Sequence, residues 1–146
     1  MTSSSQTSVL FLCSANAARS QMAEAFLKHM AGDKFQVYSA GLHPTEIHPL
    51  TVQVMNEIGI DMNGQKSKSV AVFLGKQSFD YVISVCDHTA KDCPRLFPGA
   101  LRILNWPFAD PSAEVGSSEE QINSFRKIRD LIKSKIEAFV SENDWI

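Results

Sequence analysis

Hydrophobic and polar positions follow two different periods along this chain. Over residues 19–30 and 48–60 the apolar residues recur three and four positions apart, which predicts two amphipathic helices. Residues 69–76 fit no single period, and a short helix is expected there. Short apolar runs bounded by polar or turn residues predict buried β-strands over residues 9–12, 35–41, 79–86 and 100–106.

The helix predicted at 48–60 carries signals at both of its ends. Pro49 suits its first turn and Gly59 suits its C-terminal stop. The residues expected on its buried face are Leu50, Val54 and Ile58.

A long last helix is predicted to begin at Ser117 or Ser118. Ser118 and Gln121 fit a capping box, in which each side chain bonds the other residue's backbone N–H. The apolar stripe of this helix comprises Ile122, Phe125, Ile128, Ile132, Ile136 and Phe139. Because strands alternate with helices, we expect one α/β domain over residues 1–146, with a four-stranded parallel sheet and helices on both faces. Residues 1–7 are expected to be flexible.

Composition and charge limit the partners and the cellular location that we expect for this domain. The chain has 146 residues, 44% of them hydrophobic, and a net charge of −2, which gives no reason to expect a nucleic acid or a membrane as partner. The N-terminal residues lack the pattern of a signal peptide, so a cytoplasmic location is expected. Thiols stay reduced in the cytosol, and three cysteines cannot all pair, which raises the question of thiol chemistry.

The first cysteine, Cys13, ends an apolar run, and a helix is predicted to begin about six residues later. Ligands of open α/β sheets bind at the carboxyl ends of strands, and a helix N-terminus there favours an oxyanion or a thiolate. Arg19 offers a planar fork to a tetrahedral anion, Ser20 can donate to the thiolate, and Asn16 can brace the loop. The alternative is that Cys13 is a small buried apolar residue.

The stretch CSANAARSQMAEA resembles the phosphate-binding loop shared by low-molecular-weight protein tyrosine phosphatases and thioredoxin-coupled arsenate reductases. The similarity continues in VYSAGL, EIGID, CDHTAKDCP and WPFADP, so it covers most of the chain. It implies a low-molecular-weight phosphatase-like fold and a nucleophilic Cys13. The oxyanion-binding loop that it implies consists of Ser14, Ala15, Asn16, Ala17, Ala18, Arg19 and Ser20. Ala17 stands where the reductases usually carry a serine, so the loop has one hydroxyl fewer.

The residue Asp110 precedes Pro111, and from spacing alone it fits an ordinary turn. The resemblance instead implies that Asp110 is the general acid that protonates the leaving oxygen.

The other two cysteines bear on the choice between the two branches of the family. The resemblance implies a relay for arsenate reduction in arsenic resistance: Cys13 attacks arsenate, Cys86 attacks Cys13, and Cys93 attacks Cys86. Thioredoxin is then the reductant, and no bound cofactor is needed. Over a regular helix the Cα atoms of Cys86 and Cys93 would stand about 10 Å apart. A disulfide requires less than about 7 Å. We therefore expect residues 87–94 to unfold locally on oxidation.

Several alternatives stay open at this stage. Cys86 and Cys93 could be inert buried thiols, or zinc ligands together with His88 and Cys13, although no metal is expected. A phosphatase acting through a Cys13 phosphoenzyme is the main alternative function, and weak phosphatase activity is expected in either case. Ala18, where the phosphatases usually carry a second cysteine, favours the reductase.

Two further expectations concern ions and assembly. Some members of the reductase family bind a potassium ion beside the loop, and Asn16 and Ser39 match two of its ligands. Lysines stand at the other two ligand positions, in residues 64–69, and the ammonium group of Lys68 could replace the charge of the ion. No potassium dependence is therefore expected, and the protein is expected to be a monomer that binds arsenate and thioredoxin.

Overall fold

The computed structural model describes residues 6–86, 98–113 and 115–142. Its four strands form one fully parallel sheet in the order β2-β1-β3-β4. These strands are β1 Thr7–Cys13, β2 Phe35–Gly41, β3 Phe79–Ser84 and β4 Ala100–Asn105. The helices are α1 Arg19–Ala31, α2 Pro49–Glu57 and α3 Ser118–Glu142, with short 3₁₀ segments η2 Val70–Val72 and η3 Pro111–Ala113. The predicted single α/β domain with a four-stranded parallel sheet is confirmed.

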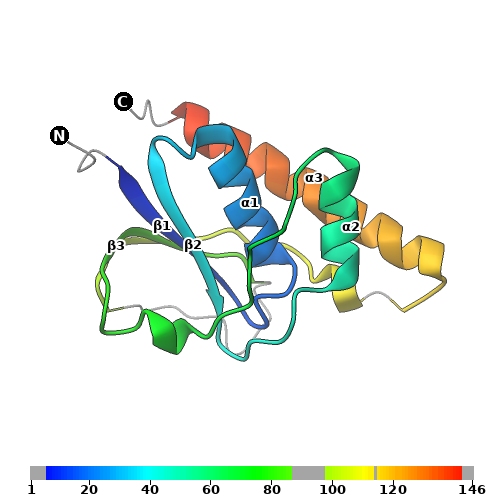
Figure 1. Cartoon of the computed structure of the whole chain (residues 1–146), viewed down its shortest axis with the longest axis horizontal. Coiled ribbons are helices and arrows are strands. Elements are labelled where there is room, and N and C mark those ends of the chain that lie inside the picture. The colour runs from blue at the N-terminus through cyan, green and yellow to red at the C-terminus, as the bar shows by residue number, and fades with distance from the viewer. Residues whose placement is uncertain (1–5, 87–97, 114, 143–146) are drawn as a thin grey trace.

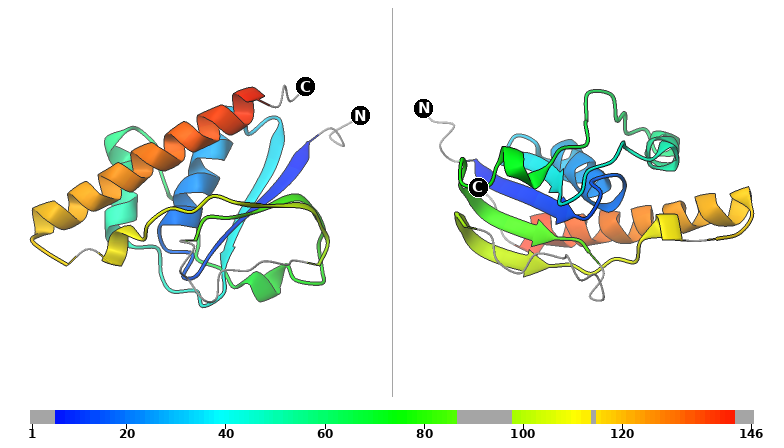
Figure 2. Two further views of the ribbon diagram at one scale, coloured as in Figure 1. Left: turned by 180° about the vertical axis from the view of Figure 1, so that it is seen from behind. Right: turned by 90° about the horizontal axis from the view of Figure 1, so that it is seen from below.

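Successive side chains of β1 point to opposite faces of the sheet, and each face has its own core. Val9 and Phe11 pack in the larger core beneath α1, α2 and α3. Leu10 and Leu12 pack on the other face, against Phe73 beside η2. The helical cover is therefore uneven, with the three α-helices on one side and the short η2 segment on the other (Figure 1, Figure 2). None of the helices in the described ranges is long and apolar enough to span a membrane.

The structure corrects the expected face of α2. The helix ends at Glu57 and buries Thr51, Val54 and Met55, whereas Ile58 follows the helix and is 39% exposed. Gly59, at φ 82°, follows the last turn as the predicted stop, and Ile58, the last residue of the apolar spacing, therefore lies one residue beyond the helix.

The start of α3 is also corrected in detail. Ser117, not Ser118, closes the capping box: its Oγ accepts from the Glu120 N–H at 3.1 Å, and Glu120 Oε1 accepts from the Ser117 N–H at 3.0 Å. The predicted apolar stripe is buried from Phe125 to Phe139, and Ile122 packs partly buried at its edge.

Candidate active site

The predicted oxyanion loop, residues 13–20, connects the carboxyl end of β1 to the first turn of α1. The carbonyl groups on its outer side are held by backbone N–H groups of residues 42–48. Leu42 donates to Cys13, His43 to Ser14, Thr45 to Ala15 and His48 to Ala17, at 2.8–3.2 Å. In a planar trans peptide the next N–H points away from the carbonyl. The N–H groups of residues 14, 15, 16 and 18 are therefore turned to the inner side of the loop, where an oxyanion would sit.

The loop is braced from within by Asn16, which is fully buried and has φ 52°. Asparagine is one of the few residues that adopts this left-handed conformation readily. Its Nδ2 donates to Ser20 Oγ at 2.8 Å and to Ser39 Oγ at 3.0 Å. Its Oδ1 accepts from Gln21 Nε2 at 2.9 Å and from the Lys68 N–H at 2.8 Å. Because every donor and acceptor of the amide is used, the loop has one well-defined shape.

The bonding of Asn16 also fixes the direction of the bond to the thiol. Ser20 Oγ lies 2.8 Å from Cys13 Sγ, and it already accepts the Asn16 amide hydrogen. The one hydroxyl hydrogen of Ser20 is thereby left to donate to the sulfur. The Asn16 backbone N–H approaches the same sulfur at 3.3 Å. Two donors thus face Cys13 Sγ, and the loop leads directly into the N-terminus of α1.

The predicted acid Asp110 lies across the cavity mouth from the loop. Its Oδ1 accepts from the Ser112 N–H at 2.9 Å and from Ser112 Oγ at 2.7 Å, and its side chain is 43% exposed. Arg19 connects the two parts of the site. Its Nη1 donates to the Phe108 carbonyl at 3.0 Å, and its Nη2 lies 3.8 Å from Asp110 Oδ2.

A cavity of about 320 Å³ brings the loop, Cys13, Arg19 and Asp110 together. The cavity is also lined by four polar residues that the sequence analysis did not identify as site residues: Thr45, Glu46, His48 and Ser112. From sequence, His48 is expected only at a surface or a helix end, and it does cap α2, since its Nδ1 accepts from the Leu50 N–H at 3.1 Å. These residues lie far from the cysteine in sequence, and only the helix-capping position of His48 gives any signal.

The second cysteine, Cys86, lies at the same sheet edge as Cys13. Leu12 pairs with Ser84 across β1 and β3, so both thiols come just after the paired ends of neighbouring strands. The Cys86 side chain is buried, and its sulfur is 4.0 Å from the Leu12 carbonyl oxygen, at the peptide that leads into Cys13. Neither cysteine forms a disulfide with a residue that the structure describes. Cys93, His88 and the predicted unfolding segment 87–94 lie outside the described residues.

A buried carboxylate completes the surroundings of the loop. Glu24 of α1 accepts from Ser39 Oγ, forms an ion pair with Lys28, and lies 4.0 Å from Lys68 Nζ. Burial lowers the pKa of Lys68, and the Glu24 carboxylate partly offsets this effect. Lys68, the lysine expected to replace the charge of a potassium ion, therefore lies beside this carboxylate. Within residues 6–86, 98–113 and 115–142, no cluster of three or more histidine, cysteine or acidic residues could hold a metal.

The parallel sheet of order β2-β1-β3-β4, with Cys13 at the end of β1 and Arg19 at the start of α1, matches the low-molecular-weight phosphatase-like fold. Residues 8–144 match the family of the low molecular weight phosphotyrosine protein phosphatases, and the chain belongs to this family.

Within the family, the chain is similar to proteins named as arsenate reductases. It is 38% identical over 136 residues to the arsenate reductase of Shouchella clausii (strain KSM-K16), covering 93% of this chain and 96% of that one. The structure of an arsenate reductase in the phosphate binding state superposes with a TM-score of 0.78 at 31% identity, over 94% of this chain and 98% of that chain. A thioredoxin-dependent arsenate reductase of Corynebacterium glutamicum superposes with a TM-score of 0.57 at 33% identity, over 92% of this chain and 63% of that chain.

Proposed function

We propose that this chain is an arsenate reductase that converts arsenate to arsenite through a relay of three cysteines and is regenerated by thioredoxin. The names of its relatives support the reaction. The observation that carries the thiol chemistry is the placement of Cys86, a second buried cysteine beside the peptide of Cys13. A phosphoryl transfer through Cys13 alone would need no second thiol there.

The first step is a displacement at arsenic. The Cys13 thiolate attacks arsenate held by the inward N–H groups and Arg19, a sulfur–arsenic bond forms, and an arsenic–oxygen bond breaks. Asp110, at the mouth of the cavity, supplies the proton to the leaving oxygen, which departs as water.

The second step moves two electrons onto arsenic. The Cys86 thiolate attacks Cys13 Sγ, a sulfur–sulfur bond forms, and the electron pair of the sulfur–arsenic bond leaves with arsenic as arsenite. Cys93 then attacks Cys86, which frees Cys13 as a thiol and leaves a Cys86–Cys93 disulfide. The two thiols of thioredoxin reduce that disulfide. The name of the Corynebacterium neighbour supports this reductant, and a cytoplasmic setting with reduced thiols is part of the same proposal.

The walls of the cavity favour a small oxyanion over an aryl phosphate. Beyond the loop itself they consist of Thr45, Glu46, His48, Asp110 and Ser112, all of them polar or charged. An aryl ester would need apolar or aromatic walls to stabilise its ring by burial. The alternative function, a tyrosine phosphatase, is favoured by the family match and by the loop, which accepts any tetrahedral anion.

One experiment separates the two functions. NADPH oxidation is followed with arsenate, thioredoxin and thioredoxin reductase for the wild type and for Cys13→Ser, Cys86→Ser and Cys93→Ser. Turnover should require all three thiols, whereas slow hydrolysis of p-nitrophenyl phosphate should require only Cys13 and Asp110. Full arsenate turnover without Cys86 or Cys93 would contradict the relay. No arsenate turnover in the wild type, together with rapid ester hydrolysis, would make the protein a phosphatase.

A further inference from the structure

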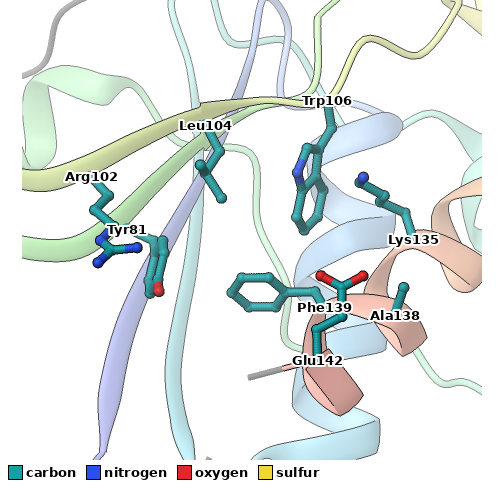
Figure 3. A pocket seen from close by; sticks show the side chains of 8 residues that line it. All are labelled: Tyr81, Arg102, Leu104, Trp106, Lys135, Ala138, Phe139 and Glu142. Atoms are coloured by element: carbon teal, nitrogen blue, oxygen red, sulfur yellow. The ribbon is translucent and has the colours of Figure 1, made fainter. Parts of the chain in front are cut away.

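A second cavity, of about 210 Å³, lies between β4 and the last turns of α3, and we call it the β4–α3 groove. It shares no lining residue with the oxyanion cavity. Three aromatic rings from separate elements form its apolar part: Tyr81, Trp106 and Phe139 (Figure 3). The centroid of the Phe139 ring lies 5.4 Å from that of Tyr81 and 5.4 Å from that of Trp106, so the rings hold each other in place.

The groove contains a buried hydrogen-bond donor without an acceptor. Trp106 is only 8% exposed, and its indole N–H finds no acceptor among the residues that the structure describes. Figure 3 shows the ring nitrogen on the edge of the indole that faces Leu104 and β4, with Arg102 farther along the same strand. A buried donor left unpaired is costly, and nearly all such groups in native proteins have a partner. An acceptor from outside the protein would therefore be stabilised at this point.

The charges on the rims of the groove show which acceptor fits. Arg102, on the β4 rim, forms no ion pair within the described part of the chain. On the α3 rim, Lys135 Nζ lies 5.4 Å from the centroid of the Trp106 ring, and Glu142 adds one carboxylate to the same rim (Figure 3). The charged residues of the groove are thus two cations and one carboxylate, and the planar guanidinium of Arg102 matches a carboxylate in shape and charge.

We propose that the β4–α3 groove binds an aromatic carboxylate. The carboxylate accepts from the Trp106 indole N–H and is attracted by the Arg102 guanidinium on the rim, and the ring of the ligand packs against Phe139 and Tyr81. A phosphate or arsenate group suits this site less well, because the floor is aromatic and Glu142 repels a second negative charge. Binding here requires neither Cys13 nor the proposed reductase activity.

The test uses the fluorescence of Trp106, with Trp145→Phe as the background so that a single tryptophan reports. The probe is 3-phenylpropionate, which does not absorb at the wavelength that excites tryptophan, and 3-phenylpropanamide is the uncharged control. We expect a saturable change with a dissociation constant of about 1 mM or tighter for the acid, as for a small ligand of this size. Arg102→Gln, at an exposed position, should weaken binding of the acid about tenfold.

Matched controls separate this site from non-specific charge and from the oxyanion loop. Lys133→Gln removes one exposed positive charge of α3 that does not line the groove, and it should leave binding unchanged. The probe should not slow alkylation of Cys13 by iodoacetamide, and phosphate should not displace it. The proposal is overturned by a linear titration, by equal effects of acid and amide, or by an unchanged constant in Arg102→Gln. It is equally overturned by protection of Cys13, or by binding that occurs only when residues 143–146 are deleted.

Discussion

Replacing Gly41 with alanine should disable the oxyanion loop through a steric overlap at the end of β2. A Cβ atom at this position would lie 2.8 Å from the Asn16 nitrogen and from the Ser14 carbonyl oxygen, and 2.9 Å from the Ala15 carbonyl carbon. All three atoms are backbone, so no side-chain rotation relieves the overlap. The φ angle of Gly41 is not in the left-handed region, so the steric contact is the whole effect.

The size of the effect follows from the displacement that the overlap demands. The contacts are about half an ångström shorter than the 3.4 Å at which ordinary van der Waals contact begins. The loop must therefore move by a comparable distance, and its inward N–H groups move with it. Since a misplacement of 1 Å can cost about 100-fold in rate, we expect kcat/KM to fall about tenfold, or about 1.4 kcal/mol of transition-state stabilisation. Overpacking should also cost about 1–3 kcal/mol of folding stability.

The matched control is Gly64→Ala, which tests whether a general loss of stability explains the result. Gly64 has φ +91°, and no heavy atom lies within 4 Å of the place that an added Cβ atom would take, so alanine there meets backbone strain but no overlap. This strain should cost about 1–3 kcal/mol and leave catalysis unchanged.

The assay for both variants combines urea unfolding with a direct measure of oxyanion affinity. Affinity is measured as the phosphate concentration that half-protects Cys13 from iodoacetamide, which does not depend on the overall reaction. Gly41→Ala should need about tenfold more phosphate than Gly64→Ala at similar stability. Equal phosphate affinity in the two variants would refute the steric argument.

Three further outcomes are expected from the contacts around the loop and the helix start. Ser20→Ala removes the hydroxyl that donates to Cys13, and it should slow the alkylation of Cys13 by iodoacetamide at pH 6 about tenfold. An alkylation rate equal to that of the wild type would contradict this prediction. Ser117→Ala should lower the free energy of unfolding, measured in urea melts, by about 1 kcal/mol, and Ser118→Ala should lower it by much less. A larger loss in Ser118→Ala would show that Ser118 is the capping residue. Because burial lowers the pKa of Lys68 below 10.5, the folded protein binds fewer protons than the unfolded chain between the lowered value and 10.5. The free energy of unfolding of the wild type, relative to that of Lys68→Met, should therefore rise with pH through that window and stay constant below it. A decrease of this difference between pH 7 and 10.5 in urea melts would contradict the prediction.

The fold was predictable because the pattern of apolar residues that marks each main element is clear in the sequence. The stripe of α3 repeats its apolar spacing over several turns, and the strands are short apolar runs between clear turn residues. The helix start was not predictable to the residue, because both Ser117–Glu120 and Ser118–Gln121 fit the same box. Only the structure decides which serine adopts the capping geometry.

The site was predictable where one local segment builds it and not where the fold assembles it. Cys13 and Arg19 lie on one strand–loop–helix segment, so their spacing could be interpreted directly. Thr45 and His48 reach the same cavity because their backbone N–H groups bond the outer carbonyls of the loop. Such a contact depends on the path of the main chain, and any residue except proline could make it.

The same backbone contacts explain how a loop of small, uncharged residues comes to favour an anion. An isolated loop could satisfy its carbonyls and N–H groups equally well with water. Once residues 42–48 hold the carbonyls of one side, the peptide planes have no freedom left, and the N–H groups must converge on the other side. Arg19 adds the single full charge, and its bond to the Phe108 carbonyl places that charge between the loop and Asp110. Ala17, which stands where the reductases usually carry a serine, takes part in the same arrangement through its backbone. What this position gives the loop is its carbonyl, which accepts from the His48 N–H and from Thr51 Oγ1 at 3.0 Å each, and alanine provides that carbonyl as well as serine does.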